Sequence, residues 1–194
     1  MDQKNIVISH LPEEIQLDKH IKLSTVRAGR FEEFKSGLIN DFEHMHRWLP
    51  WVQEDIDGSS KEFYEQSAQK KIDDLEVNWN ILIDDKLAGT ISLLKRDPKA
   101  ECLEIGYWSF SQYNGKRIMT RCAKLLVDLA FQQTDADGVL IACDKANTHS
   151  ANVAIRAGLI YFREYEDKRE AAFDSGVSLN YKMTREEWKL ISDQ

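Results

Sequence analysis

The hydrophobic and polar positions of the chain follow two periods, one typical of strands and one typical of helices. Between residues 21 and 25, apolar and polar residues alternate, which indicates a half-buried strand. From Phe31 to Met45, apolar residues recur every three or four positions, which predicts one face of a helix. The segment ending at Pro50 interrupts this pattern, because proline disfavours helix at the residue before it.

A second helix and three strands are predicted next. Ser59 and Glu62 have the spacing of a capping box, and apolar residues follow them at helical spacing. Residues 79–83 and 87–94 are apolar runs separated by a short polar turn, which is the pattern of an antiparallel hairpin. A third strand is expected after the turn at residues 96–99.

Residues 104–120 are the most informative segment, because they predict a strand, a tight turn and the start of a helix. The strand part carries one carboxylate, Glu104, which faces away from its apolar neighbours. The turn at 113–116 contains a glycine, and the crossover helix is expected over 115–132. Such a turn gathers unpaired N–H groups and the positive end of the helix dipole, an arrangement that suits phosphate. A phosphorylated cofactor is therefore expected beside a carboxylate.

The last third of the chain predicts a buried strand and a short helix. Residues 139–143 form a continuous apolar run, as in a strand buried on both faces. Asn147 is a good N-cap and Gly158 a good stop signal for the helix between them. Two strands near 160–165 and 177–183 and a terminal helix follow. The whole pattern predicts one α/β domain over 1–194, with a mixed, mostly antiparallel sheet covered by helices on both faces.

Composition and charge narrow the function further. Of the 194 residues, 42% are hydrophobic and 30% are charged, as in an ordinary globular protein. The sequence has no apolar stretch long enough to cross a bilayer and no signal-peptide pattern. A cytoplasmic protein without membrane contact is therefore expected. Three cysteines and five histidines lack ligand spacing, which predicts neither a metal site nor a disulfide framework. The net charge of −7 argues against direct nucleic-acid binding and is compatible with an amine substrate.

Three short motifs resemble those of a known family. Asn-Gly-Lys-Arg-Ile-Met-Thr at 114–120 resembles the acyl-CoA pyrophosphate loop of the GNAT acetyltransferases, and Glu-Ile-Gly-Tyr-Trp at 104–108 resembles their Rim-type branch, which acetylates ribosomal-protein N-termini. Asn-x-x-Ser at 147–150, before a helix that ends in Gly-Leu, is similar to the second family signature. The resemblance extends over residues 20 to 190 and implies a GNAT fold, in which the two parallel strands splay apart to admit the pantetheine arm.

The resemblance also implies acetyl-CoA as co-substrate and a set of residues that bind it. The pyrophosphate is expected at the loop, the pantetheine beside the end of the preceding strand, and further contacts at two asparagines of the second signature. These residues are Asn114, Gly115, Lys116, Arg117, Ile118, Met119 and Thr120 in the loop, Trp108, Ser109 and Phe110 in the strand, and Asn147 and Asn152.

Acetyl transfer from a thioester to an amine needs a neutral amine and a proton donor for the departing thiolate. The resemblance implies that Ser150 is this donor, since Ala154 stands where many family members carry a tyrosine. The alternative for Ser150 is helix capping or bonding to backbone. Glu104 is the candidate base, directly or through water, and its alternative is a solvated strand carboxylate.

Arg117 stands where the family loop carries a glycine. At the first helical turn φ is negative, so no backbone strain is expected from the arginine. If its side chain turns outward, the N–H cradle survives and the guanidinium can add a phosphate contact. If the side chain turns inward, it blocks the site. We expect a retained site.

Three functions stay open at this point. The first is acetylation of a protein N-terminal amine, and the second is acetylation of a small amine such as a polyamine or an aminoglycoside. The third is a degenerate acyl-CoA-binding module, disabled by Arg117. An α-amine with a pKa near 8 is about one-tenth neutral at pH 7, against about one lysine in 2,500, which favours the first function. A second copy of the chain, in a homodimer, is a further candidate partner.

Overall fold

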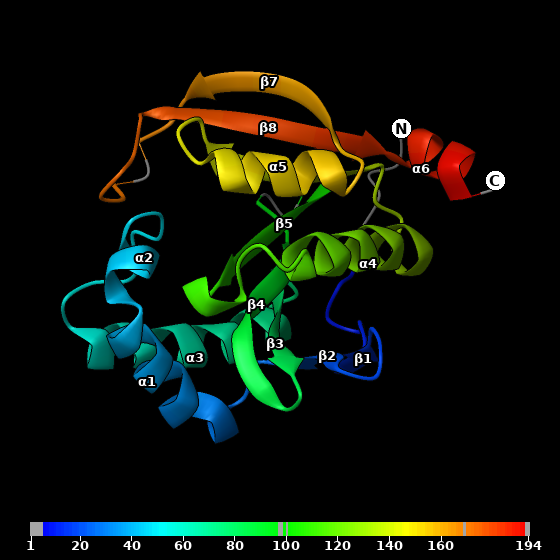
Figure 1. Cartoon of the computed structure of the whole chain (residues 1–194). Coiled ribbons are helices and arrows are strands. Elements are labelled where there is room, and N and C mark those ends of the chain that lie inside the picture. The colour runs from blue at the N-terminus through cyan, green and yellow to red at the C-terminus, as the bar shows by residue number, and fades with distance from the viewer. Residues whose placement is uncertain (1–5, 97–98, 100, 169, 193–194) are drawn as a thin grey trace.

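The structure is a computed structural model that describes residues 6–96, 99, 101–168 and 170–192, and its centre is an eight-stranded sheet (Figure 1). The strand order is β1-β2-β3-β4-β5-β6-β8-β7. The strands are β1 (Glu14–Gln16), β2 (Ile21–Thr25), β3 (Glu76–Ile83), β4 (Lys86–Leu94), β5 (Cys102–Ser109), β6 (Gly138–Asp144), β7 (Ile160–Glu166) and β8 (Val177–Thr184). The hairpin, the buried strand and the two late strands are all present, as the sequence predicts.

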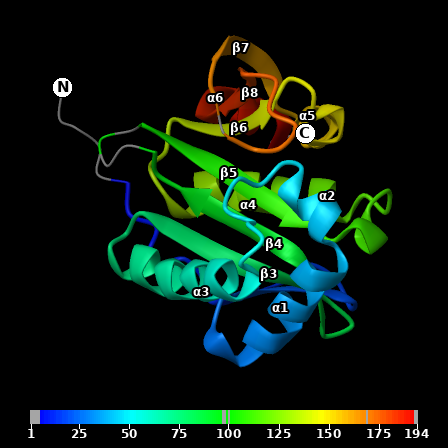
Figure 2. The same ribbon diagram turned by 90° about the vertical axis from the view of Figure 1, so that its left-hand side faces the viewer.

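Helices cover both faces of the sheet, which confirms the predicted mixed α/β architecture (Figure 2). Three helices pack on one face: α1 (Phe31–Asn40), α2 (Phe42–His46) and α3 (Ile56–Ile72). The others are α4 (Ile118–Gln133), α5 (Thr148–Arg156) and α6 (Arg185–Ser192), and α4 and α5 contribute to the larger core on the opposite face. Two short 3₁₀ turns, η1 (Ala28–Arg30) and η2 (Ser111–Tyr113), precede α1 and α4.

The strands β5 and β6 run parallel, and they pair only at their beginnings. Residues 102–104 of β5 register with 138–140 of β6, whereas both strands continue well beyond these pairs. In the described part of the sheet, every other neighbouring pair is antiparallel. The two strands therefore separate after Glu104, which confirms the expected splay. The helix α4 connects β5 to β6, and Figure 1 shows it next to α5.

Two predictions about helix boundaries are wrong. The helix α3 begins at Ile56, three residues before the predicted capping box, because Asp55 is the N-cap and its carboxylate accepts the N–H of Gly58 at 3.0 Å. The hydroxyl of Ser59 instead accepts the N–H of Gln53 at 3.3 Å. The predicted helical face from Phe31 to Met45 is divided at Asp41 into α1 and α2. The predicted turn at 96–99 lies partly outside the described residues.

An ion pair fixes the N-terminal segment to the turn that precedes β3. Asp74 accepts the N–H groups of Ile8 and Ser9 at 2.7 and 2.6 Å through one carboxylate oxygen, and it pairs with Lys95 through the other. The ammonium group of Lys95 also donates to the carbonyl of Ile6 at 3.0 Å. These contacts hold the apolar residues Ile6 and Ile8 in the core.

Candidate active site

A cavity of about 500 Å³ lies where β5 and β6 have separated. Its walls come from segments that are far apart in the sequence. The parts of β5 and β6 beyond their pairing contribute Tyr107, Trp108, Ser109, Ala142, Cys143 and Asp144, and α5 contributes His149, Ser150, Val153 and Arg156 after its N-cap Asn147. The loop before α4, α2 with the region after it, the strands β3 and β4, and the connection between β7 and β8 also contribute.

The loop before α4 turns through two left-handed residues. Gly115 has φ 75° and Arg117 has φ 58°, and the helix begins only at Ile118. The expectations of a helix from residue 115 and of a negative φ at Arg117 are therefore wrong. The physical reason is that the chain must reverse between η2 and α4, and left-handed residues make such a reversal in few positions. The backbone of Arg117 is strained, because an L-residue rarely adopts the left-handed conformation.

The same loop has the features of an anion site. Arg117 is the N-cap of α4, and its side chain forms no capping hydrogen bond, so the first N–H groups of the helix keep their capacity to donate. The loop contributes Asn114, Gly115, Arg117, Ile118, Met119 and Thr120 to the cavity wall. Lys116 is not part of that wall, and its ammonium lies 5.4 Å from the ring centre of Tyr113. An N-terminus of this kind can bind a phosphate.

Ser150 and Tyr107 form a hydroxyl pair on the cavity wall. Their oxygens are 2.9 Å apart, and the phenol oxygen is also 3.1 Å from the carbonyl oxygen of Ser150. The capping role belongs to Asn147, whose side-chain oxygen accepts the N–H of Ser150 at 3.1 Å, as the sequence predicts for that asparagine. Burial raises the pKa of Tyr107 far above its usual value, so the phenol stays protonated. The pair therefore holds protons beside the cavity at neutral pH.

Glu104 is not brought to the cavity, so the structure gives no support to its expected role as base. Its carboxylate forms a double hydrogen bond with the guanidinium of Arg96, at 2.8 and 2.6 Å, and the residue is buried. The β5 contribution to the cavity wall begins at Tyr107. The position of Glu104 in the paired part of β5, opposite Leu140, keeps it away from the splayed end.

Two further residues expected at the cofactor site lie elsewhere. Phe110 points into the smaller core, where its ring lies 5.3 Å from that of Trp108 and against Gly37 of α1. Asn152 is exposed on α5 and is not part of the cavity wall. Trp108 and Ser109 do line the cavity, as expected.

Sequence reasoning did not find Tyr107 as a site residue, nor the contact between distant segments that forms another wall of the cavity. This wall combines Arg47 and Trp48, after α2, with Ala171 and Asp174 from the connection between β7 and β8. Phe173 holds the two segments together, because its N–H donates to the carbonyl of Arg47 at 3.1 Å and its ring lies 4.4 Å from the Arg47 guanidinium carbon. No local pattern signals a contact between such distant segments.

Within the described ranges, no three His, Cys, Asp or Glu side chains gather closely enough to hold a metal ion. Nor does any helix in that part of the chain combine the length and apolar character needed to cross a membrane.

The fold and the cavity agree with the comparisons. The pattern of the acetyltransferase (GNAT) domain family matches residues 20–160, so the chain belongs to the GNAT acetyltransferase family and is an acyltransferase. The putative ribosomal N-acetyltransferase YdaF of Bacillus subtilis (strain 168) is 25% identical over 182 residues, which are 90% of this chain and 96% of that protein. The ribosomal-protein-serine acetyltransferase of Escherichia coli (strain K12) is 31% identical over 80 residues, 41% of this chain and 45% of that protein.

Solved structures share the fold. RimL, a ribosomal L7/L12 α-N-protein acetyltransferase in complex with coenzyme A, has a TM-score of 0.81 at 17% identity and covers 90% of this chain and 99% of its own. The microcin C7 self-immunity acetyltransferase MccE, in complex with acetyl-CoA and AMP, has a TM-score of 0.80 at 22% identity and covers 91% of this chain and 98% of its own.

Proposed function

We propose that the protein transfers the acetyl group of acetyl-CoA to the N-terminal α-amine of a protein, with a ribosomal protein as acceptor. Two sequence relatives carry ribosomal-protein acetyltransferase names, and one of them spans nearly the whole chain. The fold neighbours include a ribosomal L7/L12 α-N-protein acetyltransferase. The motif Glu-Ile-Gly-Tyr-Trp at 104–108 supports the same branch of the family.

Two features of the cavity support acetyl-CoA as its ligand. The uncapped N-terminus of α4, with Gly115 before it, offers N–H donors to the pyrophosphate, and Arg117 on the cavity wall adds a positive charge. The separated ends of β5 and β6 leave backbone groups without a ladder partner, which can bond to the amides of the pantetheine arm. When bound, acetyl-CoA supplies the activated acetyl group.

The observation that carries the proposal is the hydroxyl pair of Ser150 and Tyr107. The Ser150 hydroxyl is placed to protonate the departing thiolate sulfur, because it lies on the cavity wall and is not used for capping. Tyr107 orients this hydroxyl and stays neutral because of its burial. General acid catalysis of this kind contributes about a hundred- to ten-thousand-fold to a rate.

The acceptor must reach the cavity as a neutral amine. No side chain is assigned the role of base, because the Glu104 carboxylate is hydrogen-bonded to the Arg96 guanidinium. An α-amine with a pKa near 8 is already about one-tenth neutral at pH 7, so water can take up its proton. Lysine lacks this advantage, which favours an N-terminal acceptor.

A thiol-release assay with acetyl-CoA tests the proposal across a panel of acceptors. We expect the highest kcat/KM for short peptides that begin with serine or another small residue. The controls are the same peptides with a blocked N-terminus, together with spermidine and an aminoglycoside. Faster turnover of the small amines than of any peptide would transfer the assignment to a small-amine acetyltransferase. Absence of turnover with every acceptor, together with coenzyme A binding, would indicate a binding module.

A further inference from the structure

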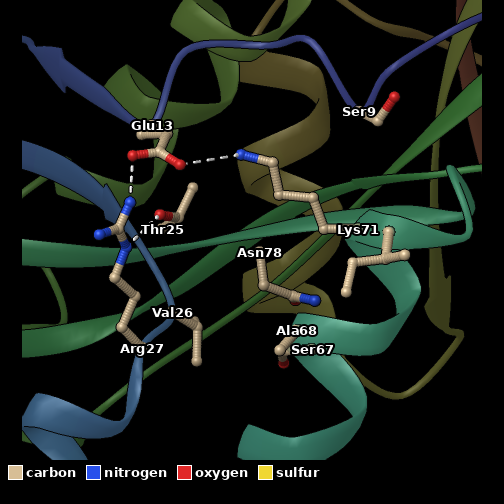
Figure 3. Close-up of a pocket in the computed structure, with 10 residues that line it drawn as sticks. Ser9, Glu13, Thr25, Val26, Arg27, Ser67, Ala68, Lys71 and Asn78 are labelled. Atoms are coloured by element: carbon tan, nitrogen blue, oxygen red, sulfur yellow. Dashed lines mark hydrogen bonds and ion pairs between the residues drawn. The ribbon is translucent and has the colours of Figure 1, made fainter.

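A second cavity, of about 440 Å³, is separate from the cavity between β5 and β6, which is called the transfer cavity below because of its proposed function (Figure 3). It is enclosed by the N-terminal segment, the end of β2, the last two turns of α3 and the start of β3. It has no lining residue in common with the transfer cavity. Its volume falls within the range of small-molecule sites, about 300–1,000 Å³.

Asn78 of β3 faces this cavity with an unused carboxamide. The residue is only 6% exposed, and none of the described residues forms a hydrogen bond with its side chain, although its main-chain carbonyl accepts the N–H of Val26 at 2.9 Å. Figure 3 shows the side chain extending from β3 toward α3, near Ala68. The carboxamide atoms are not among the fully buried polar atoms that lack a partner, so they stay accessible from the cavity. The carboxamide therefore offers a donor and an acceptor to a molecule in the cavity.

The mouth of the cavity carries an excess of positive charge. The Glu13 carboxylate lies between the Arg27 guanidinium and the Lys71 ammonium, and the contact with Lys71 is long, at 3.9 Å (Figure 3). The Glu13 side chain is 61% exposed, whereas that of Lys71 is 24% exposed. Exposed ion pairs are weak, so Glu13 can turn to solvent at little cost. Two cations then remain for an anionic ligand.

Apolar surface lies beside these charges. Val26 and Ala68 line the cavity, and Ile72, also on its wall, is 76% exposed. An isoleucine so exposed beside a polar cavity gains stability when a ligand covers it. The cavity thus combines a cationic mouth, an apolar wall and an unpaired amide.

We propose that this cavity is a second ligand site, which binds a small organic carboxylate with a branched apolar chain and a hydroxyl group. The carboxylate pairs with Lys71 and Arg27, the apolar chain covers Ile72 and Val26, and the hydroxyl bonds to the Asn78 carboxamide. Because the two cavities share no residue, this ligand binds whether or not the transfer site is filled. The proposal does not depend on the proposed acetyl acceptor.

Nuclear magnetic resonance of the ¹⁵N-labelled protein tests the site with 2-hydroxy-4-methylpentanoate as the probe. We expect the side-chain amide signals of Asn78 and the backbone signals of Thr25 and Val26 to shift, with or without saturating coenzyme A. Lys71→Met should weaken binding at least about tenfold, because it removes the cation but keeps an apolar stem. The matched control is Lys70→Met, which changes a neighbouring lysine that is not on the cavity wall and should alter the affinity less than about twofold.

The uncharged amide of 2-hydroxy-4-methylpentanoate tests the need for the carboxylate. It should bind at least about tenfold more weakly than the acid. The proposal is overturned if the Asn78 signals do not move at about 10 mM probe, where millimolar sites are populated. Equal binding of acid and amide, equal effects of the two lysine variants, or displacement of the probe by coenzyme A would overturn it as well.

Discussion

At the start of α5, Asn147 caps the helix, and the Ser150 hydroxyl contacts Tyr107 on the cavity wall. Asn147 satisfies the first-turn N–H group, and this leaves the Ser150 hydroxyl to Tyr107 and the cavity. A capping serine would have its oxygen directed to the backbone. Ser150 therefore does not cap the helix, although a serine near a helix start can do so.

Replacing Ser150 should affect turnover more than binding. We expect Ser150→Ala to lower kcat roughly ten- to a thousand-fold, a range whose lower end lies below the usual contribution of general acid catalysis. The affinity for coenzyme A should stay nearly unchanged, because thiolate protonation matters mainly in the transition state. Steady-state kinetics and calorimetry check the two quantities. Ser36→Ala, at an exposed position of α1, is the control and should behave as the parent. An unchanged kcat in Ser150→Ala would return the serine to a structural role.

Replacing Tyr107 should have a smaller effect in the same direction. Tyr107→Phe removes the hydrogen bonds of the phenol to the hydroxyl and the carbonyl of Ser150, and it should lower kcat about two- to tenfold. In the double variant the two effects should not add, because the tyrosine acts through the serine. Additive losses would mean that the two hydroxyls act independently.

Arg117 stores backbone strain that a glycine would relieve. Its φ of 58° costs an L-residue about 1–2 kcal/mol, part of which glycine offsets by its greater freedom in the unfolded chain. We therefore expect Arg117→Gly to be more stable than Arg117→Ala by about 1 kcal/mol in urea unfolding, since both lose the guanidinium and only glycine loses the strain. Equal stability of the two variants would contradict the left-handed conformation. If the guanidinium contacts the pyrophosphate, Arg117→Ala also binds coenzyme A more weakly than the parent.

The site residues differ in how well the sequence reveals them. Asn147 and the loop at 114–120 are local features, so capping rules and the family motif locate them. Glu104 shows the limit of such reasoning, because strand alternation gives the face of its side chain but not the partner. That partner is Arg96, across the turn between β4 and β5. Tyr107 could not be found from local patterns, because its contact with Ser150 on a distant helix forms only in the folded protein.

At the scale of elements, the ion pair of Asp74 and Lys95 joins the N-terminal segment to the sheet. Burial by itself raises the pKa of Asp74, but the hydrogen bonds from Lys95 and from the N–H groups of Ile8 and Ser9 outweigh burial and lower that pKa below its ordinary value. The unfolded chain therefore binds this proton at higher pH than the folded one. The stabilisation is complete above the ordinary aspartate pKa of about 4 and is lost as the pH falls through the folded pKa.

The variant Asp74→Asn tests this contact. At pH 7 we expect it to lower the free energy of unfolding by about 2 kcal/mol, because hydrogen bonds to a charged group are lost or weakened. Below pH 4 the difference from the parent should shrink. Urea unfolding between pH 3 and pH 7 measures both effects. Asp73→Asn, at the exposed neighbouring position, is the control and should keep the pH dependence of the parent. A difference from the parent that is constant over this pH range would contradict the assignment.

Element boundaries were harder to predict than the elements themselves. Ser59 and Glu62 satisfy the capping-box pattern, yet Asp55 caps α3 because it comes first and its carboxylate reaches Gly58. In the loop before α4, the glycine at 115 suggested an earlier start of the helix. The structure continues the loop to Arg117, since a second left-handed residue completes the reversal. Both errors arise where two residues a few positions apart each carry a signal for the start of the helix.

At the scale of the whole molecule, the larger cavity depends on the separation of β5 and β6. The sequence predicts both strands and their crossover helix, and the family resemblance implies their splay. The contact between Arg47 and Phe173 could not be predicted, because the two residues are separated by most of the chain length. Contacts of this kind follow from the packing of the complete fold and leave no periodic signal in the sequence.

The central claim is that the cavity delivers an acetyl group to an N-terminal α-amine. The most direct measurement is tandem mass spectrometry of one peptide that begins with serine and contains one internal lysine, after reaction with acetyl-CoA. Both amines then compete within a single molecule. We predict that the acetyl group is found on the N-terminal nitrogen and that blocking this nitrogen abolishes the product. An acetyl group found on the lysine alone would contradict the account.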